Sequence, residues 1–176
     1  MKGGTLDELE RLRDEGKFRW LGLAIREHDK IRQVIRTRRI DAIMTFGAYN
    51  LVRQTAGSLI DECYEQGIGV ILGFIYLAGL LAGQDPAERV KGPRSGPERL
   101  YPWHLLAREW WLWARERGVS LRSVALQFGL RNPKVGSVVV GCATPHHVDE
   151  SLAAAYEPLS ESLWEEIEER IRRQND

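Results

Sequence analysis

Short apolar segments alternate with helical patterns along this chain, and the alternation limits the folds that it can adopt. Four segments rich in β-branched residues and bounded by Gly, Asn or Pro predict strands at residues 18–25, 40–46, 68–73 and 137–140. A helix that connects two neighbouring strands returns the chain so that the strands run parallel. The sequence therefore predicts an α/β fold with parallel strands and flanking helices.

Helices are predicted from apolar spacing and from residues that favour helix ends. Leu6, Leu9 and Leu12 repeat at helical spacing, and the helix that they indicate ends near Gly16. Further helices are expected at residues 29–38, 57–66, 103–117 and 120–131, with Ser120 capping the last of these, Pro145 opening another and Ser160 capping the final one. Residues 84–102 contain four prolines and are predicted to form an irregular surface loop.

The chain length limits how a four-stranded sheet can be completed. The sequence has 176 residues, whereas a complete eight-stranded α/β barrel usually needs about 250. Four strands cannot close into a barrel, and an open parallel sheet leaves two unpaired edges available for association. With 43% hydrophobic and 28% charged residues, the composition is that of a globular chain and excludes disorder as its main state.

Charge and cysteine content exclude several classes of partner. The 25 basic residues balance 25 acidic ones, so we expect neither nucleic acid nor an anionic membrane as a partner. The basic residues between 26 and 39 alternate with acidic ones and indicate a solvated helix face. The uncharged segment 67–83 contains five glycines, which favours a buried strand and a loop over a membrane span. Two cysteines and a charged N-terminus predict a cytoplasmic protein.

The strongest functional signal is the segment 136–151, which joins a strand, a tight turn and the start of a helix. Thr144 is placed to cap this helix and Pro145 occupies its first position, so the free N–H groups of the first turn would face an anion such as phosphate. An ordinary strand-to-helix connection is the alternative. The adjacent His146 and His147 diverge by about 100° on a helix, so no metal site is expected there.

A second loop, residues 73–83, follows the third predicted strand directly, and with this loop the chain resembles the aldo-keto reductase family. The resemblance rests on residues 15–23, 49–51, 67–71 and 77–81 and on the turn at Gly141. It extends from Thr5 to about Arg170, but it matches only the second half of the family's barrel. The sequence of these segments is most similar to the branch that oxidises aldoses such as L-fucose or L-galactose. The resemblance thus implies that residues 1–176 form four βα units, the C-terminal half of a (β/α)8 TIM barrel.

The resemblance also implies a binding site for NAD or NADP in the last two strand-end loops. Tyr76 lies in the loop that would cover the pyrophosphate, and the residues expected around the adenosine are Gly141, Cys142, Thr144, His147, Glu150 and Ser151. Phe74 and Ile75 replace a Ser-Pro pair that is usual in the family. His147 stands where many NADP-using members carry Arg or Gln, and a neutral imidazole pairs less strongly with a 2′-phosphate, which favours NAD.

No catalytic residue is predicted, because the Asp, Tyr, Lys and His set of the family belongs to the other half of its barrel. Tyr49 and His28 fall near strand ends without a lysine beside them, and we interpret them as turn and rim residues. The expected function is hydride transfer to or from an aldehyde or aldose once an N-terminal half completes the site. The alternatives are a non-catalytic half-barrel that forms a homodimer or pairs with another chain, and a truncated gene product. The tryptophans at 103, 110, 111 and 113 are expected to pack against the sheet.

Overall fold

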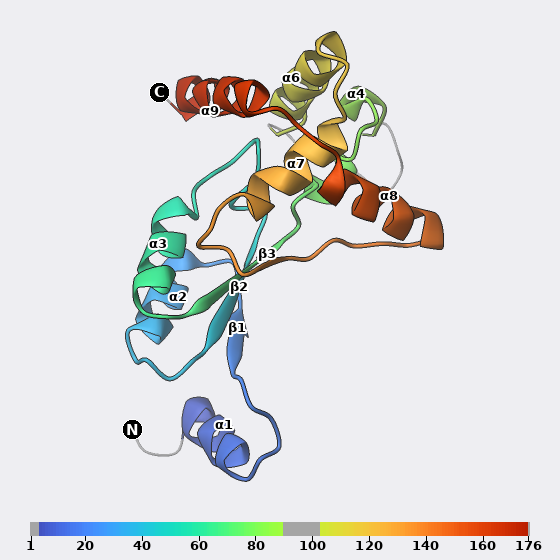
Figure 1. Ribbon diagram of the computed structural model, residues 1–176. Helices are drawn as coiled ribbons and strands as arrows, with labels where there is room; N and C mark the ends of the chain where they lie inside the picture. Colours follow the sequence, from blue (N-terminus) through green and yellow to red (C-terminus); the bar gives the residue numbers. More distant parts are fainter. Residues whose placement is uncertain (1–3, 90–102, 176) are drawn as a thin grey trace.

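The computed structural model describes residues 4–89 and 103–175, and strands alternate with helices through most of this part (Figure 1). The elements are α1 (Thr5–Asp14), β1 (Gly22–Ala24), α2 (His28–Ile35), β2 (Ala42–Phe46), α3 (Gly57–Glu65), β3 (Gly69–Gly73), the 3₁₀ turn η1 (Leu77–Gly79), α4 (Pro86–Arg89), α6 (Trp103–Glu116), α7 (Leu121–Leu130), β4 (Ser137–Val138), α8 (Pro145–Tyr156) and α9 (Glu161–Asn175).

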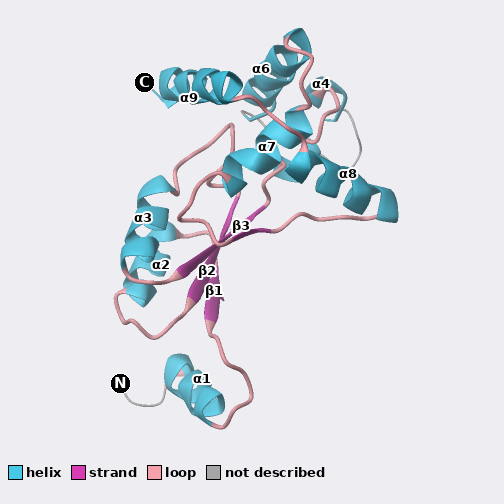
Figure 2. Cartoon of the chain, viewed as in Figure 1, coloured by secondary structure: helices cyan, strands magenta, loops and turns pink. Residues whose placement is uncertain are grey.

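The four strands form one parallel sheet in the order β1-β2-β3-β4 (Figure 2). Ala24, Met44, Ile71 and Ser137 lie in one row across the sheet. The predicted α/β class with parallel strands and flanking helices is confirmed. Each strand pairs with its neighbour in sequence, so the order never reverses.

The two outer strands are shorter than predicted. The prediction gave residues 18–25 and 137–140, whereas the observed strands are Gly22–Ala24 and Ser137–Val138. Each outer strand has a partner on one side only. At the start of β1, the Leu21 N–H donates to an Asp41 carboxylate oxygen at 2.8 Å in place of a backbone carbonyl. In the segment predicted to be irregular, Pro86 opens the four-residue helix α4, while residues 90–102 lie outside the described part.

The predicted helix starts are confirmed by their capping bonds. Ser120 Oγ accepts from the Ser123 N–H at 3.3 Å, and Ser160 Oγ accepts from the Leu163 N–H at 3.2 Å. Thr144 Oγ1 accepts from the His147 N–H at 3.3 Å, with a proline in the first turn of α8. Each hydroxyl satisfies a backbone donor that would otherwise lack a partner.

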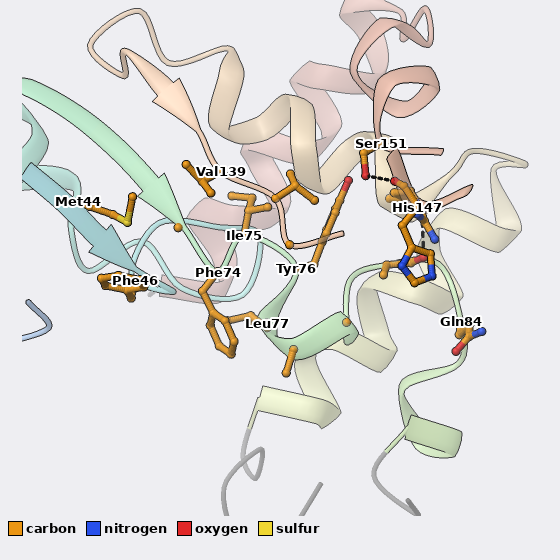
Figure 3. Close-up of a pocket in the computed structure, with 17 residues that line it drawn as sticks. Met44, Phe46, Phe74, Ile75, Tyr76, Leu77, Gln84, Val139, His147 and Ser151 are labelled. Carbon is orange, nitrogen blue, oxygen red and sulfur yellow. Dashed lines mark hydrogen bonds between the residues drawn. The ribbon is translucent and has the colours of Figure 1, made fainter. Parts of the chain in front are cut away.

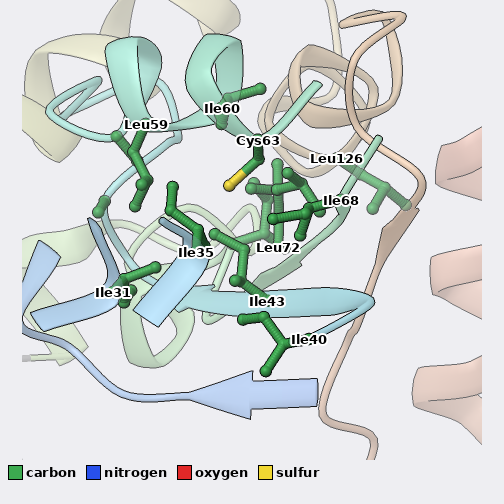
Figure 4. Close-up of a cluster of buried hydrophobic side chains, with 14 of the residues drawn as sticks. Ile31, Ile35, Ile40, Ile43, Leu59, Ile60, Cys63, Ile68, Leu72 and Leu126 are labelled. Carbon is green, nitrogen blue, oxygen red and sulfur yellow. The ribbon is translucent and has the colours of Figure 1, made fainter. Parts of the chain in front are cut away.

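The first hydrophobic core lies between the sheet and the helices on one side of it (Figure 4). Alternate strand residues face this core; Ile43, Val70 and Leu72 are at most 1% exposed. They pack against side chains from α2 and α3 that include Ile31, Ile35, Leu59, Ile60 and Cys63. The row of Ala24, Met44, Ile71 and Ser137 belongs to neither buried cluster among the described residues. The sheet therefore has one face covered by helices and one face without such a cover.

A second core joins α6, α7 and α9 to the loop after β3. Trp110 is fully buried there and meets Trp113 edge to face, with ring centroids 5.3 Å apart. The prediction that these tryptophans pack is confirmed for Trp110 and Trp113, but their partners differ from those expected. They belong to the cluster of Leu77, Leu80 and other loop and helix residues, with no strand residue in it among those described. This core supports the loop after β3 from behind.

Several basic residues of α2 and its flanks are paired with carboxylates. Arg32 Nε lies 2.8 Å from Glu62 Oε1, and the Arg39 guanidinium bonds to Asp7 and Glu10 on α1. The positive charges of both arginines are thereby balanced by neighbouring carboxylates. None of the helices within residues 4–89 and 103–175 is long and apolar enough to cross a membrane.

Candidate functional site

A hollow of about 650 Å³ lies at the carboxyl ends of β2, β3 and β4 (Figure 3). Parallel α/β folds commonly bind ligands at this end of their strands. The wall is mostly apolar, and its polar side chains come from the loop after β3, from α7 and from α8. The lining residues are Met44, Phe46, Gly73, Phe74, Ile75, Tyr76, Leu77, Ala78, Gly79, Ala82, Gln84, Arg122, Val139, Val140, Gly141, His147 and Ser151.

The loop after β3 has an unusual backbone that its surroundings hold in place. Phe74, Leu77 and Ala78 have φ angles of 61°, 47° and 55°, a region that side-chain-bearing residues rarely adopt. Ile75 is buried in the first core and Leu77 in the second, so both cores anchor the loop. Gly47, at φ 61°, passes so close that a Cβ there would lie 2.9 Å from Phe74 Cδ1. The packing thus fixes this wall of the hollow before any ligand arrives.

The first turn of α8 forms the polar end of the hollow. The Ala143 N–H donates to His147 Nδ1 at 3.2 Å. Ser151 Oγ donates to the His147 carbonyl at 2.7 Å. The Ala143 N–H thus contacts the imidazole, and Ser151 bonds to the backbone of the same turn.

Tyr76 reaches from the loop after β3 toward Ser151 and His147 (Figure 3). Its hydroxyl oxygen is buried and makes no hydrogen bond of standard geometry within the described residues. Burial raises the pKa of Tyr76 to about 12, although the nearby Arg122 and Ser151 act in the opposite direction. The phenol therefore stays protonated at neutral pH and can donate a hydrogen bond to a ligand. A buried polar group without a partner is destabilising until something binds to it.

Arg122, which the sequence reasoning missed, is the one lysine or arginine among the described lining residues. It stands second in α7, and its side chain is 19% exposed. Its Nε donates to the Ala82 carbonyl at 3.2 Å, and its Nη1 lies 2.9 Å from Glu150 Oε2. The guanidinium thus connects the loop after β3 to α8 and brings a positive charge to the hollow.

The structure brings four of the seven predicted cofactor residues to the hollow: Tyr76, Gly141, His147 and Ser151. Thr144 instead caps α8. Cys142 is exposed, with its Sγ 3.9 Å from Ser151 Oγ, and Glu150 pairs with Arg122. These last three therefore support or border the hollow and do not line it.

Of the two residues considered for catalysis, Tyr49 makes structural contacts. Tyr49 stacks on Phe128 with ring centroids 5.2 Å apart, and its hydroxyl accepts from Asn132 Nδ2 at 2.9 Å. Burial raises the pKa of Tyr49. The pKa of His28, at the start of α2, is lowered by desolvation. The positive charge of Lys134 acts to lower the pKa of Tyr49, against the effect of burial. Lys134 is itself paired with Asp61, with its Nζ 2.7 Å from Asp61 Oδ1.

No group of three His, Cys, Asp or Glu that could hold a metal ion occurs within residues 4–89 and 103–175. The hollow thus offers hydrogen-bond donors and one cation, which suit an anionic ligand with polar groups. Within the described lining it has no carboxylate or lysine that could act as a general base.

Comparison with known proteins agrees with this architecture. The chain is 29% identical over 163 residues to a D-threo-aldose 1-dehydrogenase from Pseudomonas sp, covering 92% of this chain and 49% of that protein. It is 28% identical to an L-galactose dehydrogenase from Arabidopsis thaliana, covering 87% and 47%. A solved glycerol dehydrogenase from Gluconobacter oxydans shares the fold, with a TM-score of 0.74 at 18% identity, over 97% of this chain and 54% of that one.

The chain spans about half the length of these relatives. The model of the Aldo/keto reductase family matches residues 4–172, which is nearly the whole chain. The family predicted from the sequence is confirmed: this chain belongs to the aldo/keto reductase family.

Proposed function

We propose that this chain is the cofactor-binding half of an NAD(P)-dependent oxidoreductase, in which hydride passes between the cofactor and an aldehyde or aldose. The observation that carries the proposal is the hollow at the carboxyl ends of β2, β3 and β4, with a phenol, an imidazole N–H and a guanidinium at its polar end. These donors fit the phosphates and ribose hydroxyls of a dinucleotide. A bound nicotinamide would supply the redox chemistry, while this chain binds and orients the cofactor.

The strand order supports a half-barrel over residues 1–176. Right-handed crossovers between strands in the order β1-β2-β3-β4 place the connecting helices on one face of the sheet, and residues of α2, α3 and α7 share the core on that face. A sheet that binds ligands at a strand-order reversal has helices on both faces instead. Parallel sheets are normally buried on both faces, and in a barrel the uncovered face becomes the interior. The row of Ala24, Met44, Ile71 and Ser137 would then face the barrel centre.

The relatives motivate the substrate class and cofactor. Two of them are named for the dehydrogenation of D-threo-aldoses and of L-galactose, and we propose an aldose or aldehyde for this site by analogy. We favour NAD over NADP because an imidazole at His147 would pair less strongly with a 2′-phosphate than the guanidinium of an arginine would. The cysteine content supports a cytoplasmic location, which stays a prediction.

We propose that the partner half-barrel is a unit with a strand at each end and not a second copy of this chain. Closing two half-barrels creates two new junctions between strands, and a helix covers each junction. This chain already has α1 before β1 and α8 after β4. A second copy would bring two further helices to the same two places. On α8, the exposed side chains Val148, Leu152 and Tyr156 recur every fourth residue and would pack against such a unit.

Thermal unfolding tests cofactor binding directly. A ligand that binds the native state alone stabilises it, so NAD about tenfold above its Kd should raise the Tm by about 3–6 °C. NADP should do so less at equal concentration. Tryptophan fluorescence provides a second readout, since Trp111 Nε1 donates to the Gly83 carbonyl beside the hollow. If neither dinucleotide at millimolar concentration changes the Tm or the fluorescence, the cofactor assignment is wrong, and the non-catalytic alternative is favoured.

A further inference from the structure

Helix α1 is attached to the rest of the chain in a different way from the other helices. It buries no residue, whereas every other helix of eight or more residues in the described part buries at least one. Of its leucines, Leu6 packs against the first core, but Leu9 and Leu12 belong to neither core among the described residues. Figure 1 shows α1 apart from the other helices, beyond the start of β1. Apolar burial therefore holds α1 less firmly than it holds the other helices.

A guanidinium from outside α1 binds two of its carboxylates. Arg39, which lies between α2 and β2, donates from Nε to Glu10 Oε1 at 2.9 Å and from Nη2 to Glu10 Oε2 at 2.5 Å. Nη2 also donates to Asp7, one turn earlier on the same helix. The three side chains are between 29% and 37% exposed, so solvent screens these charges only in part. Paired bonds between a guanidinium and a carboxylate are among the strongest polar contacts in proteins.

A second ion pair joins α1 to the edge of the sheet. Arg13 Nη1 lies 3.7 Å from Asp41 Oδ2, and the same oxygen accepts from the Leu21 N–H at the start of β1. Residues 15–21, between α1 and β1, form neither a helix nor a strand. They include Gly16 at φ 76°, a conformation that favours glycine. This connection can change its conformation without breaking a helix or a strand, so α1 can leave the sheet while the rest of the chain stays folded.

We propose that Arg39, Asp7 and Glu10 form a clasp that holds α1 on the sheet, and that α1 detaches when the clasp is screened by salt or broken. A helix of 10 residues is marginally stable alone in water, so detachment should also unfold it. Local openings of this kind expose backbone amides while the rest of a domain stays protected. The inference does not depend on the proposed function. In the half-barrel proposed above, the clasp would also hold α1 at the junction beside β1.

Hydrogen–deuterium exchange of the full chain, followed in residues 5–14, tests the clasp. Raising NaCl from about 0.05 M to about 1 M shortens the Debye length to about 3 Å, so exchange in α1 of the wild type should become about tenfold faster. Arg39→Gln should exchange at the faster rate already at low salt, with little further change when salt is added. Exchange in α3 should be the same in both proteins, because the first core stays intact.

Arg11→Gln is the matched control. Arg11 also bonds to two carboxylates, Glu8 and Glu15, but both lie within four residues of it along the chain. Its substitution should change exchange in α1 by about threefold or less, because such pairs contribute little to helix stability. The proposal is overturned if Arg39→Gln and Arg11→Gln exchange alike, or if α1 of the wild type is unprotected at low salt. It is also overturned if salt acts equally on the wild type and Arg39→Gln, or if Arg39→Gln loses protection in α3 as well.

Discussion

Replacement of Trp110 by alanine should destabilise the chain by about 3–5 kcal/mol, the range seen when a large aromatic side chain is deleted from a core. Trp110 is fully buried, its Nε1 donates to Gln174 Oε1 at 3.1 Å, and the Arg170 guanidinium lies 4.9 Å from its ring centroid. The variant would lose this packing and leave Gln174 without its donor. A chain of this size should lose about 2–4 °C of Tm per kcal/mol, hence roughly 6–20 °C in total.

Trp20→Ala is the control for this loss, because Trp20 is 73% exposed. Its Tm should change by about 2 °C or less, as for most surface substitutions. Since Leu77 and Trp110 belong to the same core, Trp110→Ala should also loosen the loop after β3 and weaken dinucleotide binding. Equal Tm values for the two variants would show that the second core does not stabilise this fold as described.

The 176-residue chain should show no turnover of NADH or NAD with aldehydes or aldoses, and the complementary half-barrel that we propose as its partner should produce turnover when it is added. The described lining of the hollow holds no carboxylate or lysine, its Tyr76 and His147 are assigned to cofactor binding, and Tyr49 and Lys134 are engaged with Asn132 and Asp61. Positioned acid-base groups typically contribute about 10²–10⁴-fold to a rate. The probe is the part of the Pseudomonas D-threo-aldose 1-dehydrogenase that this chain does not match, added as a separate polypeptide.

Two measurements make this experiment decisive. Light scattering should show a monomer for the chain alone and a one-to-one complex in the mixture, because a second copy would bring two further helices, α1 and α8, to the same two junctions. Leu152→Lys, which puts a charge into the exposed apolar row of α8, should weaken the complex without lowering the Tm of the free chain. Substantial turnover by the chain alone would overturn the claim that it lacks a catalytic set. A stable homodimer would contradict the proposed partner.

The central strands and the capped helices were predictable because their signals are local. The alternation of Ile43 with Met44 and the hydroxyls of Ser120 and Thr144 act within a few residues of where they stand. The outer strands were overestimated, because the pairing of an edge strand depends on its single neighbour. The packing of Trp110 was predictable, but its location in a second core was not, since that core depends on how α6 and α9 meet.

The site was predictable where the chain itself turns from strand to helix. His147 and Ser151 reach the hollow because Thr144 and Pro145 fix the start of α8. Arg122 was missed although the sequence carries a signal for it. A basic residue in the first turn of a helix interacts unfavourably with the helix dipole, so its presence there indicates that it contacts groups outside its own helix. Glu150 was predicted to bind the cofactor but pairs with Arg122. This pairing depends on the contact between α7 and α8, which no local sequence pattern shows.

Calorimetric titration of NAD into the wild type and into Gly141→Trp tests the central claim most directly. Gly141 lines the hollow, and a Cβ there would meet no atom within 4 Å, so a side chain can be attached at this position and an indole would narrow the hollow. A Cβ at Gly57 has the same freedom away from the hollow, which makes Gly57→Trp the matched control. We expect one saturable site in the wild type and in Gly57→Trp, and binding at least about tenfold weaker in Gly141→Trp. Absence of binding in the wild type, or equal binding by all three proteins, would contradict the assignment of this hollow as the dinucleotide site.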